Sequence, residues 1–262
     1  MDLGLRNKIV LVTGGAKGIG AATVEEFLAE DCRVVLVDRD SETGTTLSKT
    51  LGSRVQYIEA DLTVSKACKK AIEQTVSLFG GLDVLVNNAG FNDGLGLETP
   101  PEDFMRSVQN NLLHVYAMTH YALPLLRKGQ GCLVNLGSKV SETGQGHTSA
   151  YAAAKGAISA LTREWAVALA PDKIRVNCVI PAECLTDQYE QFFLSQVEPE
   201  AAKKAISKLV PFAQRLTTPQ EIAQTIVFLA SDRSSHTTGQ LVFVDGGYTH
   251  FDRAVGHGHN KW

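Results

Sequence analysis

The sequence of 262 residues predicts an α/β fold with a doubly wound parallel sheet of about seven strands and helices on both faces. Short segments rich in Val, Ile and Leu alternate along the chain with longer segments of helical period. Most short segments are apolar at every position, which is typical of parallel strands covered on both faces. No repeat, low-complexity tract or Pro/Gly-rich linker interrupts this alternation, so we predict a single domain over residues 1–262.

Seven segments are predicted to be strands. In chain order they are KIVLVT at 8–13, RVVLVD at 33–38, RVQYI at 54–58, LDVLVN at 82–87, CLVNLG at 132–137, IRVNCVI at 174–180 and QLVFVD at 240–245. Amphipathic segments between them are long enough to be crossover helices, among them 21–30, 65–79 and 101–126. The segment at about 183–211 is mostly polar and of helical character, and we predict a flap over the site there. A tail at about 255–262 is predicted to be disordered.

Composition and charge narrow the classes of function. The 25 basic and 28 acidic residues give a net charge of −3. This charge does not indicate binding to nucleic acid or to an anionic membrane, and we expect neither as a partner. The sequence contains neither 18 consecutive apolar residues nor a signal-peptide cleavage pattern. The five cysteines have no metal-ligand spacing, and their odd number argues against a full set of disulfides. We therefore expect a cytoplasmic protein that acts on a small molecule.

A glycine-rich loop follows the first predicted strand. The segment TGGAKGIG at 13–20 leads into a predicted helix, whose N-terminus stabilises a pyrophosphate that the glycines allow to approach. Asp38 closes the second strand 18 residues after Gly20, where a carboxylate can accept hydrogen bonds from the adenosine ribose. The pattern predicts a dinucleotide-binding domain of the Rossmann type. Its expected cofactor contacts in the loop are Gly14, Lys17, Gly18, Ile19 and Gly20.

Asp38 favours NAD over NADP, because its carboxylate would repel a 2′-phosphate. Lys17 and Arg39 point the other way, since either cation is able to meet a phosphate, although a solvated surface charge also explains both. We expect NAD as the cofactor. Asp61, with Leu62 beside it, has two interpretations of equal weight: a hydrogen bond to the adenine, or a cap on the helix that follows.

The segment TSAYAAAKGA at 148–157 places a tyrosine and a lysine four residues apart in a run of alanines. On a helix these positions share a face, so Tyr151 and Lys155 present their polar ends side by side. A tyrosine that acts as a base at neutral pH needs a pKa roughly 3 below its ordinary value. A nearby ammonium and the positive nicotinamide ring of NAD⁺ together are sufficient for this. Alone, such a pair is more often coincidence than function.

The chain resembles the short-chain dehydrogenase/reductase family in several motifs at once. These are TGGAKGIG at 13–20, Asp38, NNAG at 87–90, Ser138, YAAAK at 151–155 and VDGG at 244–247, in the family's order and spacing. The resemblance implies a NAD-dependent oxidoreductase that needs no metal, with hydride transfer between substrate carbon and nicotinamide C4. It also implies a homotetramer.

The resemblance implies roles for individual residues. Tyr151 resembles the catalytic acid/base, and Lys155 resembles the residue that holds the nicotinamide ribose and lowers the tyrosine pKa. Ser138 resembles the serine that hydrogen-bonds the reacting oxygen. Asn111 resembles the asparagine that positions a water behind Lys155, and its neighbour Asn110 is a rival for that role. Tyr151 and Lys155 are also expected to contact the cofactor. The implied cofactor cleft is completed by Asn88, Ala89 and Gly90 on the adenosine side, and by Pro181 and Thr186 near the carboxamide.

The expected pocket mouth is polar, which favours a ligand with several hydroxyls. Its residues are Asn92, Asp93, Gln145, His147 and Glu183. The substrate contacts that we assign are Asn92, Ser138, Gln145, Tyr151 and Glu183. Phe192 and Phe193 are counter-evidence, but we expect them to form the buried face of the flap helix.

Five longer segments resemble those of bacterial L-fucose dehydrogenases, a group within that family. They are FNDGLGLE, TGQGHTSAY, TREWAVAL, IPAECLT and SHTTGQLVFVDGGYTHFDRA. This resemblance implies oxidation of the anomeric hydroxyl of a 6-deoxy or related aldose to the lactone. The alternatives are another alcohol or ketone of the same family, such as a sugar acid, a steroid or a 3-oxoacyl thioester, and a catalytically silent nucleotide-binding scaffold.

Overall fold

The computed structural model of the protein describes residues 2–250. A seven-stranded sheet in the order β3-β2-β1-β4-β5-β6-β7 lies at its centre, and all strand pairs are parallel. The strands are β1 Ile9–Thr13, β2 Arg33–Asp38, β3 Val55–Glu59, β4 Val84–Asn87, β5 Cys132–Leu136, β6 Arg175–Pro181 and β7 Leu241–Val244. The predicted fold class is confirmed, and each predicted strand is found within two residues of its expected bounds.

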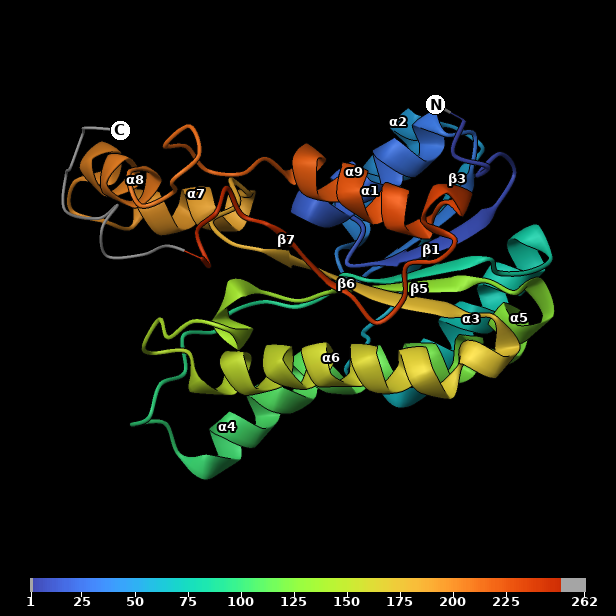
Figure 1. Ribbon diagram of the computed structural model, residues 1–262, viewed down its shortest axis with the longest axis horizontal. Coiled ribbons are helices and arrows are strands. Elements are labelled where there is room, and N and C mark those ends of the chain that lie inside the picture. The colour runs from blue at the N-terminus through green and yellow to red at the C-terminus, as the bar shows by residue number, and fades with distance from the viewer. Residues whose placement is uncertain (1, 251–262) are drawn as a thin grey trace.

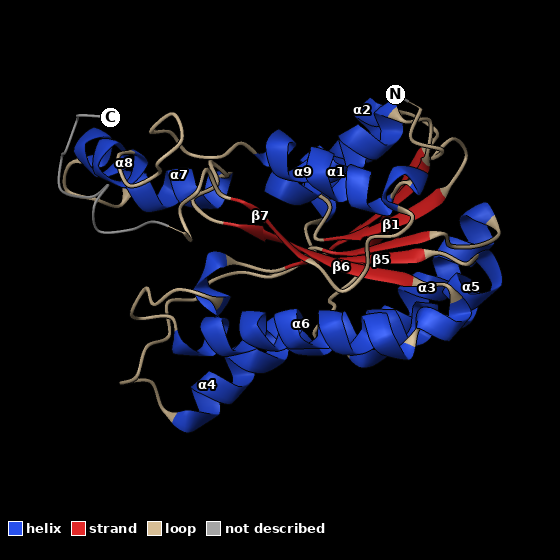
Figure 2. Cartoon of the chain, in the orientation of Figure 1, coloured by secondary structure: helices blue, strands red, loops and turns tan. Residues whose placement is uncertain are grey.

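Helices cover both faces of the sheet (Figure 1). On one face lie α1 Gly18–Ala29, α2 Ser41–Leu51 and α9 Pro219–Ala230. On the other lie α3 Ser65–Phe79, α5 His114–Gly129 and α6 Ser149–Ala168, so that the chain forms three layers (Figure 2). Each interface between the sheet and its helices contains its own apolar core. Strands with helices on both sides must be apolar on both sides, which is the pattern found in β1 and β4.

The predicted helix at 101–126 is not uniform. It begins with α4 Pro101–Val108, continues through one π-helical turn at Gln109–Leu113, and resumes as α5. A π-helical turn interrupts the regular α-helical hydrogen bonds and is frequent at functional sites. The change in period was not visible in the sequence.

The segment at 183–211 contains α7 Asp187–Leu194 and α8 Pro199–Ser207, as its helical pattern predicted. Both helices lie beyond the carboxyl ends of β6 and β7 (Figure 1). Whether they move as a flap stays a prediction, and the tail at about 255–262 lies outside the described residues. The strand order reverses between β1 and β4, where the loops that follow the two strands diverge. Ligands of doubly wound sheets bind at this point.

Candidate active site

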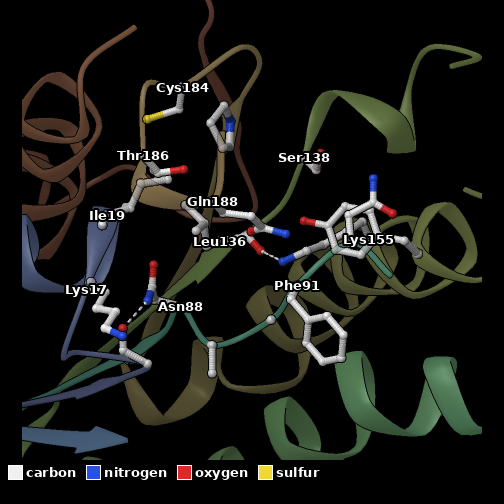
Figure 3. Close-up of a pocket in the computed structure, with 18 of the residues that line it drawn as sticks. Lys17, Ile19, Asn88, Phe91, Leu136, Ser138, Lys155, Cys184, Thr186 and Gln188 are labelled. Carbon is white, nitrogen blue, oxygen red and sulfur yellow. Dashed lines mark hydrogen bonds between the residues drawn. The ribbon is translucent and has the colours of Figure 1, made fainter. Parts of the chain in front are cut away.

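A cavity of about 960 Å³ lies across the carboxyl ends of the strands. All predicted cofactor and substrate residues line its wall, and so do Ser138, Tyr151 and Lys155. Asn111 lies behind the wall while Asn110 lines it. Asp93, which we expected at the pocket mouth, is not part of the wall either. The cavity joins segments that are far apart in the sequence, from the glycine-rich loop to α7, as Figure 3 shows.

The glycine-rich loop brings backbone close to the cavity. Gly14 has a positive φ of 63°, and a Cβ added at Gly20 would collide with the Gly14 carbonyl oxygen. Helix α1 begins within this segment, at Gly18, and its N-cap residue Lys17 provides no side-chain cap. Asn88 Nδ2 holds the loop by donating to the carbonyl oxygens of Thr13 at 2.9 Å and Gly14 at 3.0 Å. This arrangement fits a pyrophosphate at the start of α1.

The choice between NAD and NADP depends on Asp38 and on the two nearby cations, Lys17 and Arg39. Asp38 Oδ2 accepts from the Ala16 backbone N–H at 3.1 Å. Lys17 Nζ lies 2.6 Å from Asp40 Oδ2, so its charge already has a partner. The Arg39 guanidinium lies 5.9 Å from the centroid of the Phe91 ring. Both cations therefore have other interactions, while Asp38 lies at the cavity wall.

The cap interpretation of Asp61 is wrong. Helix α3 begins at Ser65, and its N-cap residue is Val64, which makes no side-chain cap. Asp61 Oδ1 instead accepts from the backbone N–H of Thr63 at 3.0 Å and from its hydroxyl at 2.7 Å, in a turn that precedes the helix. Hydrogen bonds from Thr63 lower the pKa of Asp61.

Tyr151 and Lys155 lie one turn apart on α6 and meet the cavity together. Lys155 is buried, and its Nζ donates to the Leu136 carbonyl oxygen at 2.8 Å (Figure 3). The same Nζ lies 5.5 Å from the centroid of the Tyr151 ring. Burial lowers the pKa of Lys155 to about 8. Burial also raises the pKa of Tyr151 to about 12, against a hydrogen bond to Ser138 that lowers it. The charge of Lys155 alone is therefore not enough to bring the pKa of Tyr151 below its ordinary value against the effect of burial.

Asn111 is fully buried within the π-helical turn. Its Oδ1 accepts from the Phe91 backbone N–H at 2.9 Å, and its Nδ2 donates to the Ser107 carbonyl oxygen at 3.1 Å. A Cβ at Gly90 would lie 3.2 Å from Asn111 Oδ1 and 3.4 Å from Lys155 Nζ. The glycine thus leaves a small space that Asn111 and Lys155 both border.

The end of the cavity beyond Ser138 contains two charged side chains, of which the sequence predicted only Glu183. Lys139 Nζ forms an ion pair with Glu183, although both side chains are almost fully buried. Burial raises the pKa of Glu183 and lowers the pKa of Lys139, while their mutual contact opposes both shifts and favours the charged forms. Lys139 was missed because a lysine in a sequence is normally a surface residue.

Of the two phenylalanines that we expected to be buried in the flap helix, only one is buried. Phe193 is buried, but Phe192 is 46% exposed and lines the cavity beside Tyr189. His114, also missed, lines the cavity with both ring nitrogens unpaired within the described residues, and burial lowers its pKa to about 4.

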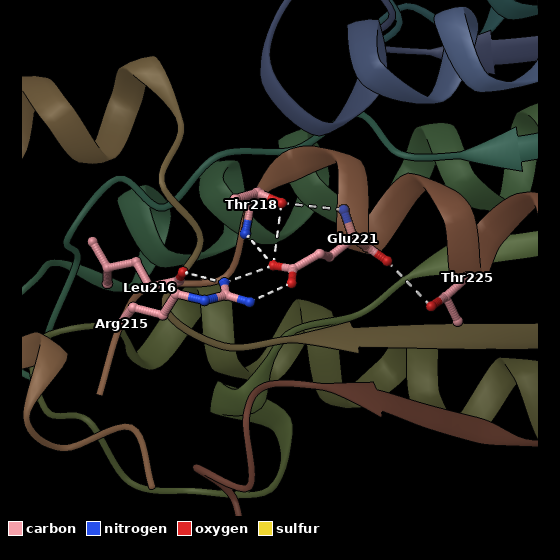
Figure 4. Close-up of polar contacts among 5 residues, drawn as sticks. All are labelled: Arg215, Leu216, Thr218, Glu221 and Thr225. Carbon is pink, nitrogen blue, oxygen red and sulfur yellow. Dashed lines mark hydrogen bonds and ion pairs between the residues drawn. The ribbon is translucent and has the colours of Figure 1, made fainter. Parts of the chain in front are cut away.

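The backbone at Glu183 is held by the segment that precedes α9. The Thr217 backbone N–H donates to the Glu183 carbonyl oxygen at 2.8 Å. The next residue, Thr218, forms a capping box with Glu221, and Arg215 pairs with the Glu221 carboxylate (Figure 4). This network fixes one side of the cavity.

Replacing Thr218 by alanine should lower the free energy of unfolding by about 1 kcal/mol, because one helix-end N–H loses its partner. The melting temperature measured in a thermal scan should fall by roughly 2–4 °C. Thr50→Ala, at an exposed position of α2 outside any cap, is the matched control. Equal melting temperatures for the two variants would contradict the capping role.

Two kinds of structure are not found among residues 2–250. No group of three or more His, Cys, Asp or Glu side chains is arranged to hold a metal ion. No helix in this part of the chain has the length and apolar character needed to cross a membrane. His257 and His259, which we expect to be solvent-facing, lie outside the described residues.

The sequence and the fold are similar to those of known enzymes. The family model for enoyl-(acyl carrier protein) reductase matches residues 14–249. The L-fucose dehydrogenase of Mus musculus is 36% identical over 242 residues, which cover 92% of this chain and 88% of the relative. The 3-oxoacyl-[acyl-carrier-protein] reductase of Thermotoga maritima is 36% identical over 248 residues, which cover 93% of this chain and 98% of the relative.

Solved structures lead to the same group of proteins. The Cj0485 dehydrogenase has a TM-score of 0.93 and 43% identity, with 97% of this chain and 98% of the other covered. The ligand-free aldohexose dehydrogenase of Thermoplasma acidophilum has a TM-score of 0.87 and 29% identity, with 95% and 96% covered. The 3-ketoacyl-(acyl-carrier-protein) reductase of Brucella melitensis, complexed with NADH, has a TM-score of 0.85 and 28% identity, with 94% and 99% covered.

Family model, relatives and structural neighbours all span nearly the whole chain, and the motifs meet in one cavity of the expected fold. The chain therefore belongs to the short-chain dehydrogenase/reductase family and is an oxidoreductase, in a family whose dehydrogenases bind a nicotinamide cofactor.

Proposed function

We propose that this enzyme is a NAD-dependent dehydrogenase that oxidises the anomeric hydroxyl of a 6-deoxy or related aldose, such as L-fucose, to the lactone. The observation that carries the proposal is the polar and charged wall beside Ser138 and Tyr151. Buried polar groups must find partners, and a ligand with several hydroxyls supplies them. The L-fucose and aldohexose dehydrogenases among the similar proteins support the same substrate class.

In this proposal the protein's own residues hold the substrate and move one proton. The Ser138 hydroxyl hydrogen-bonds the reacting oxygen, and Tyr151 removes its proton in the oxidising direction. The bound nicotinamide cofactor supplies the hydride acceptor. Lys155 holds the nicotinamide ribose and adds positive charge beside Tyr151, while Asn111 positions a water behind Lys155. An anomeric hydroxyl suits this base because it is more acidic than a simple alcohol.

The remaining cofactor contacts follow the cavity wall. We propose that the backbone of the glycine-rich loop binds the pyrophosphate and that Asp38 binds the adenosine ribose. The adenine would lie near Asp61 and Leu62, and the carboxamide near Pro181 and Thr186. At the substrate end, we propose contacts from Asn92, Gln145 and Glu183.

NAD is the proposed cofactor because Asp38 lies at the cavity wall and Lys17 and Arg39 have other partners. Replacing Asp38 by alanine should raise the KM for NAD⁺ roughly 10- to 100-fold, since hydrogen bonds to a charged acceptor are lost. The KM for NADP⁺ should fall, because the repulsion of its 2′-phosphate is removed. Initial rates with both cofactors measure the change.

Asp172→Ala is the control for this variant. Asp172 pairs with Arg127 at an Nε to Oδ2 distance of 2.8 Å and is not part of the cavity wall. The chemical change is the same, so NAD preference should persist in this variant. An Asp38→Ala enzyme with undiminished preference for NAD⁺ would remove the ribose assignment.

A panel of substrates tests the proposed reaction. Aldoses, a 3-hydroxyacyl thioester and a steroid alcohol are each offered with NAD⁺ and with NADP⁺, and reduction is followed at the nicotinamide absorbance. We expect the highest kcat/KM for a 6-deoxy or related aldose with NAD⁺. The exposed ring of Phe192 in the cavity and the similarity to the Thermotoga maritima reductase favour an acyl thioester as the second candidate. A higher kcat/KM for the thioester would establish that candidate instead.

We also propose that the chain acts as one catalytic domain with 183–211 as its flap, in a cytoplasmic homotetramer. Leu113, Tyr116 and Val167 are large exposed apolar residues on the helical layer that contains α5 and α6, and an interface between subunits would cover them. Sizing chromatography at micromolar concentration tests the oligomeric state, and a monomeric elution volume would contradict it.

A further inference from the structure

The ion pair of Lys139 and Glu183 is the most unusual feature of the cavity. The two side chains are only 9% and 4% exposed, yet both line the cavity. Lys139 directly follows Ser138 and is the first residue of a short 3-10 helix, and Glu183 lies two residues after the end of β6. Two charged groups of opposite sign therefore meet beside the proposed reacting centre.

A third group completes this cluster. Lys139 Nζ lies 4.3 Å from the centroid of the Tyr248 ring, which attracts the cation through its negative face. Tyr248 also interacts with the Glu183 carboxyl and lowers its pKa, against the effect of burial. Tyr248 follows β7 and is not itself part of the cavity wall, so it supports the pair from behind.

Stability does not explain the pair. Removing two charges from water is costly, and replacing a buried ion pair by apolar residues of similar volume is often neutral or stabilising. A buried pair at the wall of a ligand cavity is better explained by a ligand that completes its hydrogen bonds. The backbone under Glu183 is fixed by the Thr217 hydrogen bond at 2.8 Å, so the carboxylate is held in place before a ligand arrives.

We propose that Lys139 and Glu183 form a subsite for two neighbouring hydroxyls of the sugar substrate, with Tyr248 as a positioning residue for both. This inference rests on the proposed aldose dehydrogenase function and identifies Lys139 as a specificity-determining residue. Lys139 has N–H donors left beyond its bond to Glu183, and the Glu183 carboxylate has lone pairs left. Adjacent sugar hydroxyls offer an acceptor to the ammonium and a donor to the carboxylate.

The subsite discriminates against substrates that lack those hydroxyls. An acyl chain or steroid placed there would cover the ammonium and the carboxylate without replacing their lost water. A site built to hydrogen-bond a hydroxyl rejects the analogue without it strongly, because its buried polar groups remain unpaired. The same reasoning predicts that one deoxy analogue of the preferred aldose is a poor substrate.

The test combines the removal of single hydroxyls from the sugar with the removal of the two charged groups from the protein. kcat/KM is measured at saturating NAD⁺ for the preferred aldose and for its single-deoxy analogues, with the wild type, Lys139→Met and the double variant Lys139→Met/Glu183→Gln. The double variant leaves no unpaired buried charge, so it keeps the test valid if Lys139→Met alone does not fold. We expect the wild type to lose roughly 10- to 100-fold on one deoxy analogue.

In both variants, kcat/KM for the parent aldose should fall by the same factor that the wild type loses on this deoxy analogue. For the deoxy analogue itself, the variants should have a kcat/KM within about twofold of the wild type, because the interaction is already absent. The KM for NAD⁺ should not change. Two results would overturn the subsite while leaving aldose oxidation intact. One is that the effects of the protein change and of the missing hydroxyl on kcat/KM multiply, and the other is that the variants keep wild-type kcat/KM for the parent sugar. A wild type that oxidises no aldose would overturn the proposed function and this subsite together.

Lys69→Met/Glu73→Gln is the matched control for the double variant. These residues form an exposed ion pair on α3 with an Nζ to Oε1 distance of 3.7 Å, outside the cavity. The chemical change is identical. We expect wild-type kcat/KM for every sugar, and a loss as large as that of the cavity variant would show a general effect of charge and overturn the subsite.

Discussion

Replacing Tyr151 by phenylalanine should lower kcat by roughly 10²- to 10⁴-fold, which is the usual contribution of a positioned acid/base. The ring remains on α6 at the cavity wall, so only the hydroxyl and its hydrogen bond to Ser138 are lost. NADH should still bind, because the proposed pyrophosphate and adenosine contacts come from other segments. Initial rates with the preferred aldose, together with a fluorescence titration of NADH, measure the two quantities separately.

Tyr116→Phe is the control for this variant. Tyr116 lies on α5, is 54% exposed and is not part of the cavity wall. It should retain wild-type turnover if the loss in Tyr151→Phe comes from the missing acid/base. Undiminished turnover in Tyr151→Phe itself would remove Tyr151 from the proposed mechanism.

Much of this architecture follows from local patterns. Strands that are apolar at nearly every position, such as β1 and β4, are typical of a sheet between two layers of helices, so the seven predicted segments indicated a sheet covered on both faces. In a parallel sheet the segments after the strands meet at one edge. The glycine-rich loop, Asp38 and Ser138 therefore had to converge once the strands were placed.

Other features depend on tertiary contacts that a sequence does not encode locally. The burial of Lys139 requires Glu183 as its partner, and the two lie 44 positions apart in the sequence. The exposure of Phe192 depends on which face α7 presents to the cavity. The π-helical turn around Asn111 has no compositional signature, since its residues suit an ordinary helix equally well.

Lys155→Met is expected to have the other large effect. An ammonium lowers the pKa of a neighbouring acidic group by about 1 to 3 units, so its removal should reduce kcat/KM roughly 10- to 1000-fold at neutral pH. Burial already raises the pKa of Tyr151 to about 12, which leaves the tyrosine especially dependent on positive charge nearby. The variant should recover activity as the pH rises, because hydroxide then removes the tyrosine proton that Lys155 no longer helps to release.

The pH profile distinguishes this electrostatic role from a structural one. Burial lowers the pKa of Lys155 to about 8, so the ammonium is present below pH 8 and is lost as the pH rises through that value. The ratio of wild-type to variant kcat/KM should therefore be largest below pH 8 and shrink above it. A loss that is constant across the pH range would indicate that Lys155 only binds the ribose or supports the Leu136 carbonyl. Lys155→Arg, which keeps the charge, should retain more of the activity at neutral pH than Lys155→Met.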